Sequence, residues 1–66
     1  MNLQDALALF RRLGVDVLSL SSGEFRTAYV DLAKRHHPDI GNRKTHDLMA
    51  NINAARTTIL AVYRRN

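Results

Sequence analysis

A chain of 66 residues without a single cysteine has few ways to fold. A domain of this size buries only about 60% of the surface that its unfolded chain exposes, and no disulfide can compensate for a small core. Disulfide-stapled folds, Cys-rich zinc modules and a deep cleft between two layers are therefore excluded. Because the apolar fraction of 45% and the charged fraction of 24% are ordinary for globular proteins, we expect one folded domain over residues 1–66.

Apolar residues recur at helical spacing in three segments, the first of them close to the N-terminus. The pattern predicts a helix over 3–13, with Asn2 as its N-cap and Asp5 in its first turn. Gly14 should end it, since glycine readily adopts the left-handed conformation found at helix ends. The expected buried face consists of Leu3, Ala6, Leu7, Phe10 and Leu13. Segment 15–20 is an apolar connector, and we reject a strand there because it would have no pairing partner.

The second helix is expected to begin after Ser21 and to end at about His36. Ser21 and Glu24 have the spacing of a capping box, and Pro38 disfavours helical angles in the residue before it. The predicted apolar face comprises Phe25, Ala28, Tyr29, Leu32 and His36. The residues toward the other side are Arg26, Val30 and Lys34.

A third helix is expected over 46–63, after a loop over 38–44 that contains proline, glycine and asparagine. Thr45 is the expected N-cap, and Asp47 lies in the first turn. The predicted buried stripe comprises Leu48, Ile52, Ala55, Ile59 and Val62, flanked by Met49 and Tyr63. The expected fold class is all-α, with the second and third helices forming a hairpin.

Residue types that carry catalysis or bind metals form no recognised pattern in this chain. The adjacent His36 and His37 cannot both point to one metal from a helix face, and His46 has no HExxH, cysteine or paired-carboxylate pattern around it. The glycines are isolated, so no glycine-rich loop can bind a phosphate. We therefore expect no enzyme activity, no cofactor and no metal.

Charge and targeting signals indicate the kind of partner and the compartment. The net charge of +4 favours an acidic partner without naming its class. The N-terminus lacks the pattern of a signal peptide, and no run of eighteen apolar residues could span a bilayer. We expect a monomeric cytoplasmic protein that does not bind membranes.

The tripeptide His37-Pro38-Asp39 lies between two predicted amphipathic helices. Proline fixes one backbone dihedral and forces the preceding residue into an extended conformation, so the helix must end abruptly. An imidazole and a carboxylate are then held in a rigid, exposed pair that could meet a cationic group at low ordering cost. On the tripeptide alone, the alternative is a helix stop in which His37 and Asp39 only cap the loop.

The sequence around this tripeptide resembles the J-domain family of DnaJ-type co-chaperones. The similar segments are LFRRLGV at Leu9–Val15, EFRTAYVDLAKRHHPD at Glu24–Asp39 and INAARTTIL at Ile52–Leu60. They cover nearly the whole chain. The resemblance implies an antiparallel hairpin of the second and third helices with a packed N-terminal helix. Since the chain ends at Asn66, we expect a stand-alone J-domain without the short fourth helix of many relatives.

The resemblance also implies a function exerted on another protein. J-domains dock on DnaK-type heat-shock chaperones and stimulate the ATP hydrolysis of those partners. His37, Pro38 and Asp39 match the family's signature triad, in which the aspartate is expected to meet a partner arginine. The residues that match the basic face of the second helix are Arg26, Lys34 and Arg35, and Tyr29 matches a position that is partly core and partly contact.

The chain departs from the family pattern at several positions. Val30 and Asp31 stand where many members carry Lys or Arg, so the basic face is thinner. Arg56 stands where tyrosine is common, so we expect an altered contact between the second and third helices. Lys34 and Arg35 also have an alternative interpretation as solvated helix residues, with Arg35 paired to Asp31.

Two alternative functions remain open from the sequence. A basic helix-turn-helix module that binds nucleic acid is favoured by the cations at Arg11, Arg12, Arg64 and Arg65. Against it, the cations are scattered over all three helices, and about eight residues separate the last two helices where three or four are usual. The other alternative is a J-like adaptor that recruits a protein without stimulating an ATPase, against which the intact tripeptide argues.

Overall fold

A computed structural model describes residues 1–36 and 43–65 of the chain. Helix α1 spans Leu3–Arg12, α2 spans Ser22–Arg35 and α3 spans Arg43–Arg65, with a short 3₁₀ turn, η1, at Val17–Ser19. The described residues include no strand, so the all-α class and the rejection of a strand in the connector are confirmed. The predicted triad at 37–39 lies outside the described residues.

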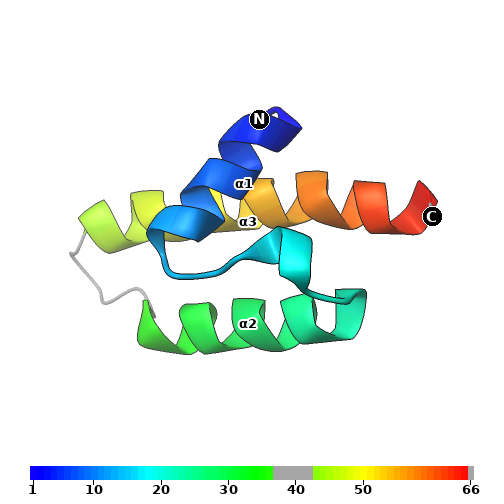
Figure 1. Ribbon diagram of the computed structural model, residues 1–66. Helices are drawn as coiled ribbons and strands as arrows, with labels where there is room; N and C mark the ends of the chain where they lie inside the picture. Colours follow the sequence, from blue (N-terminus) through cyan, green and yellow to red (C-terminus); the bar gives the residue numbers. More distant parts are fainter. Residues whose placement is uncertain (37–42, 66) are drawn as a thin grey trace.

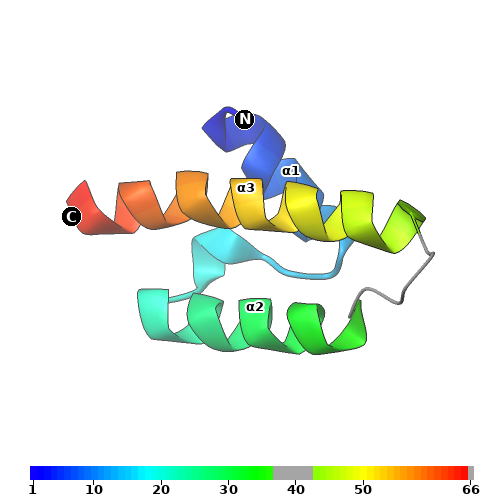
Figure 2. The ribbon, with the colours of Figure 1, turned by 180° about the vertical axis from the view of Figure 1, so that it is seen from behind.

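Helix α3 is the longest element, and both α1 and α2 pack against it. Figure 1 shows α2 and α3 side by side and running in opposite directions, while α1 crosses α3 obliquely. The view from behind shows the same arrangement with α3 in front of α1 (Figure 2). Helix α3 therefore has one flank toward α1 and another toward α2.

The ends of α1 follow from local sequence signals. The Asn2 side-chain oxygen accepts a hydrogen bond from the Asp5 N–H at 2.8 Å, as expected for the N-cap. The helix ends at Arg12, and Gly14 follows with a φ of 87°, in the left-handed region that glycine tolerates best. Both predicted boundary signals are confirmed, with the C-terminus one residue earlier than expected.

Helix α2 begins with the predicted capping box. The Glu24 N–H donates to Ser21 Oγ at 3.2 Å, and the Ser21 N–H donates to Glu24 Oε1 at 2.9 Å. The bond from the Ser21 backbone N–H stabilises the carboxylate and lowers the pKa of Glu24 below its usual range. The helix ends at Arg35 with His36 as its C-cap, close to the end predicted from Pro38.

Helix α3 begins three residues earlier and ends two residues later than the sequence predicts. Thr45 lies inside the first turn, so its prediction as the N-cap is wrong. Residues 43 and 44, which were predicted to belong to the loop, are part of the helix. Arg43 and Lys44 are good helix formers, and nothing in their sequence prevents the helix from beginning with them. At the other end, the cations Arg64 and Arg65 lie where the helix dipole favours positive charge.

One hydrophobic core joins the three helices. The rings of Phe10 and Phe25 meet edge to face with centroids 5.1 Å apart, and the centroid of Phe25 lies 5.9 Å from that of Tyr63. Phe25 thus links α2 to both α1 and α3. The buried residues are Ala6, Leu9, Phe10, Val17, Phe25, Leu32, Ile52, Ala55 and Ile59. They include only part of the faces predicted for the second and third helices, because Ala28, Tyr29, His36, Leu48 and Val62 are half-buried.

The buried face of α1 differs from the prediction at its edge. Leu3 is 38% exposed, whereas Leu9, which was not assigned to the core, is only 9% exposed. Leu7 and Leu13 are half-buried against the core. Leu9 borders α3 near Asn51, so the crossing of α1 over α3 covers that side of the apolar stripe and leaves Leu3 exposed.

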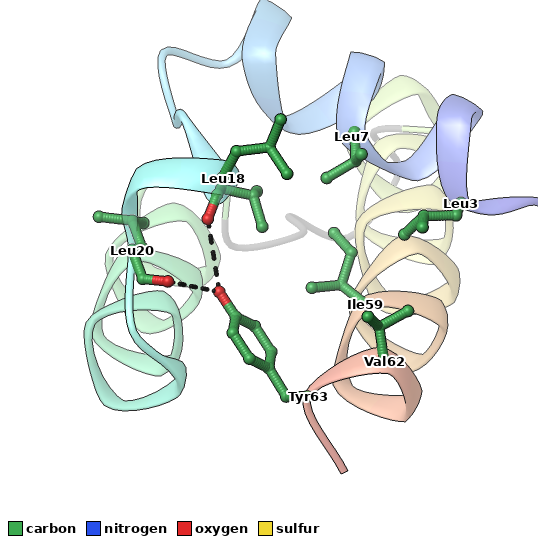
Figure 3. A pocket seen from close by; sticks show the side chains of 8 residues that line it. Leu3, Leu7, Leu18, Leu20, Ile59, Val62 and Tyr63 are labelled. Atoms are coloured by element: carbon green, nitrogen blue, oxygen red, sulfur yellow. Dashed lines mark hydrogen bonds between the residues drawn. The ribbon is translucent and has the colours of Figure 1, made fainter. Parts of the chain in front are cut away.

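Tyr63 fastens the connector between α1 and α2 to the end of α3. Its hydroxyl donates to the Leu20 carbonyl at 2.8 Å, and the Val17 carbonyl is a second acceptor at 3.4 Å (Figure 3). Burial, and to a smaller extent the Glu24 carboxylate, raise the pKa of this hydroxyl. The ring borders an apolar hollow of about 190 Å³ between α1, the connector and α3 (Figure 3).

Candidate partner-binding site

The residues expected to contact a partner fall into two groups. Arg26, Tyr29, Lys34 and Arg35 lie on α2, where their exposure and neighbours are known. The triad at 37–39 begins one residue after His36, the C-cap of α2, but it lies outside the described residues. The site can therefore be built upward from α2.

Helix α2 exposes all three of its predicted cations, yet not on one face. With about 100° between successive residues, Arg26 and Lys34 lie about 80° apart around the helix. Arg35 lies about half a turn away from Arg26, on the flank that also carries Glu24 and Asp31. A flat partner surface can therefore touch Arg26 and Lys34 together but not Arg35.

Arg35 and Asp31, which both lie in the described part of the chain, do not form the ion pair that the alternative interpretation expects. Arg35 is exposed and lies in the last turn of α2. Its charge is favourable there because of the helix dipole, whether or not a partner binds it.

Tyr29 connects α2 to α3. Its hydroxyl donates to Asn53 Oδ1 at 2.6 Å, and the guanidinium carbon of Arg56 lies 4.8 Å from the centre of its ring. The second contact is a cation–π interaction that holds Arg56 in place. Tyr29 is half-buried, so it contributes to packing and to the surface at once.

Sequence reasoning did not assign Asn53 or Arg56 to this cluster. Arg56 was noted because tyrosine is common at its position in the family that the sequence resembles, and an altered contact between the second and third helices was expected there. The residues of α3 that contact Tyr29 depend on how α2 and α3 pack against each other, which the sequence alone does not show. The sequence signal that could have found the pair is the shared helical flank of Asn53 and Arg56, three residues apart on α3.

A shallow groove lies between the first half of α2 and the second half of α3. Its hollow of about 140 Å³ is lined by Ser22 and Arg26 of α2 and by Leu60, Tyr63 and Arg64 of α3. We call this feature the α2–α3 groove. It brings the predicted contact residue Arg26 together with Arg64, which the sequence had suggested only as one of several scattered cations.

The described residues offer binding chemistry more clearly than catalytic chemistry. They hold no group of three or more His, Cys, Asp or Glu side chains placed to bind a metal ion. No helix among them combines the length and the apolar character that a bilayer crossing needs. The surface groups best suited to binding a partner are the exposed guanidinium and ammonium groups, which bind anionic groups.

Comparison with known proteins gives no match: no family model, no curated protein sequence and no solved structure matches the chain. A function must therefore be argued from the residues and geometry of this chain.

Proposed function

We propose that the chain is a J-domain co-chaperone that docks on a DnaK-type heat-shock chaperone and stimulates its ATP hydrolysis. The chain itself is not an enzyme in this proposal. The observation that carries it is the sequence His37-Pro38-Asp39 immediately after the C-cap of α2, a helix that exposes Arg26 and Lys34 on neighbouring sides.

The arrangement of the helices supports this proposal. Antiparallel α2 and α3 with a packed α1 are compatible with the helical hairpin and N-terminal helix that the resemblance implies. The hairpin of a J-domain keeps its signature loop at one end, where the second helix stops and the third begins. In this chain residues 37–42 occupy the corresponding place in the sequence.

In this proposal the basic residues of α2 and the triad have different roles, which follow from their side-chain chemistry. Arg26 and Lys34 attract an acidic surface of the chaperone and orient the domain, an effect that acts mainly on the association rate and weakens at high salt. Asp39 then meets an arginine of the chaperone, and a charge-assisted hydrogen bond of this kind is among the strongest polar contacts. Pro38 limits the conformations of the pair before binding.

The test is a single-turnover ATPase measurement on a DnaK-type chaperone with and without this chain. The proposal expects an increase in the rate of hydrolysis that saturates with the concentration of the chain. No increase with any DnaK-type chaperone at saturating concentrations would contradict it. If the chain folds and binds the chaperone without raising the rate, the adaptor alternative is correct instead.

A further inference from the structure

The α2–α3 groove gathers more positive charge than α2 alone provides. Arg26 and Arg64 line its hollow from opposite sides. Arg56 lies on the same flank of α3, because positions 56, 60 and 64 are spaced by four residues and stack along one side of a helix. Two arginines from two helices therefore line the groove, and Arg56 lies about two turns away from Arg64 on the same side of α3.

Acidic side chains lie elsewhere on the described part of the molecule. Glu24 and Asp31 occupy the flank of α2 that is turned away from Arg26, and Asp47 lies about half a turn from Arg56 on α3. Glu24 acts on the Tyr63 hydroxyl, but that hydroxyl faces the connector. The described acids Asp5 and Asp16 belong to α1 and the connector. No acidic group in the described ranges thus neutralises the groove.

The groove lies on the side of α3 that α1 does not cover. Asn51 and Thr58, on the other flank of α3, face α1: Thr58 donates to the Met1 carbonyl at 3.1 Å, and Asn51 borders a hollow with residues of α1. Figure 2 views the molecule from the uncovered side. Arg26 and Arg64 are exposed, and the half-buried Leu60 lies in the lining of the groove together with them.

The groove suits carboxylates of a protein better than a single-stranded nucleic acid. Guanidinium groups bind both carboxylates and phosphates in a two-pronged geometry, and the contact with Tyr29 holds Arg56 in place before any partner arrives. A single-stranded nucleic acid would need aromatic faces on which its bases could stack. Arg56 covers the Tyr29 ring, while Tyr63 is half-buried and bonded to the connector, so the groove offers no free ring.

Building on the proposed function, we infer that the α2–α3 groove is a second part of the chaperone docking surface. Arg64 and Arg56 of α3, together with Arg26, bind an acidic segment of the chaperone. Arg56 and Arg64 are eight residues apart, so their backbone positions are separated by about 12 Å along the helix. An extended segment of the partner would match this separation with carboxylates about four residues apart.

The experiment compares charge reversals at two matched positions. Arg64→Glu alters the groove, and Arg12→Glu alters an exposed arginine at the end of α1. Both arginines lie in the last turn of their helices, so the reversal is equally unfavourable for each helix dipole. Binding of the labelled chain to an ATP-bound DnaK-type chaperone is measured by fluorescence anisotropy at low and high salt. Circular dichroism checks the fold of each variant.

We expect Arg64→Glu to raise the dissociation constant by about five- to tenfold at low salt, against less than about twofold for Arg12→Glu. Arg64→Lys, which keeps the charge but loses the two-pronged geometry, should have an affinity between those of the parent and Arg64→Glu. Equal effects of the two reversals, with normal binding and stimulation by the parent chain, would refute the role of the α2–α3 groove in docking. The proposed function would be unaffected.

Two further outcomes would overturn the inference differently. A parent chain that neither binds nor stimulates the chaperone would refute both the proposed function and the groove. If Arg64→Glu weakened binding of a labelled duplex oligonucleotide while leaving chaperone binding unchanged, the groove would be a nucleic-acid surface instead.

Discussion

Phe25 provides the sharpest test of the fold because one ring joins all three helices. It is fully buried and contacts the ring of Phe10 on α1 and that of Tyr63 on α3. Truncation of a buried phenylalanine to alanine costs about 3–5 kcal/mol, and the lost aromatic pairs place Phe25→Ala at the upper end of that range. A chain of 66 residues has a total stability of roughly 3–10 kcal/mol, so this variant should lose much or all of its stability.

The assay for Phe25→Ala is urea unfolding followed by far-ultraviolet circular dichroism. Val30→Ala is the matched control, since Val30 lies on the same helix and is 45% exposed; its effect should stay within about 0.5 kcal/mol. The core assignment would be refuted if the free energy of unfolding of Phe25→Ala lay within about 1 kcal/mol of that of the parent. The loss of a fully buried ring that contacts three helices should lower this free energy by more than that.

Three smaller perturbations test individual contacts. Tyr29→Phe removes the hydrogen bond to Asn53 and should lower the free energy of unfolding by about 0.5–1.5 kcal/mol in a urea titration; no change would mean that the bond contributes nothing. Gly14→Ala should cost about 1 kcal/mol in a thermal melt, because φ is positive there although no atom lies close enough to clash; an unchanged melt would speak against that conformation. The folded pKa of Glu24 is lowered, so its contribution to stability is present at neutral pH and is lost as the pH falls below 4.5. Melts of Glu24→Gln should show a weaker loss of stability over that acidic range than melts of the parent, and parallel curves would contradict the capping box.

The parts of the fold that were predictable from sequence are those determined by local chemistry. The capping box at Ser21 and Glu24 satisfies backbone donors within one turn, and the Asn2 cap and Gly14 act equally locally. None of these signals needs a partner from elsewhere in the chain. The start of α3 was missed because Thr45 has a capping side chain but follows two residues that are themselves helical.

The buried edges of the helices depend on packing, so periodicity predicts them only in part. A helical apolar pattern shows that α1 has a buried stripe, but Leu3 and Leu9 both belong to plausible edges of it. The crossing of α1 over α3 decided between them, and it buried Leu9. Such a choice cannot be made from one helix considered alone.

In the candidate site, too, the features set by local sequence were predictable and those set by the packing of the helices were not. The exposure of Arg26 and Lys34 follows from the amphipathic pattern of α2 and was predictable. The neighbours of Arg26 and Tyr29 on α3 were not, because the meeting of Arg26 with Arg64, and of Tyr29 with Asn53, depends on how two antiparallel helices align. The interpretation of residues 37–39 as a docking triad stays a prediction from sequence.

The most direct measurement of the central claim is the stimulation of a DnaK-type chaperone's single-turnover ATPase by Asp39→Asn. The change is nearly isosteric and removes one charge, so its structural cost should be within about 0.5 kcal/mol, which circular dichroism of the same preparation checks. Asp16→Asn is the control, since it removes an equivalent charge from an exposed position in the connector. We predict that the parent chain and Asp16→Asn stimulate hydrolysis equally and that Asp39→Asn does not stimulate it, because the charge-assisted contact with a partner cation is lost. Full stimulation by a well-folded Asp39→Asn variant would contradict the claim.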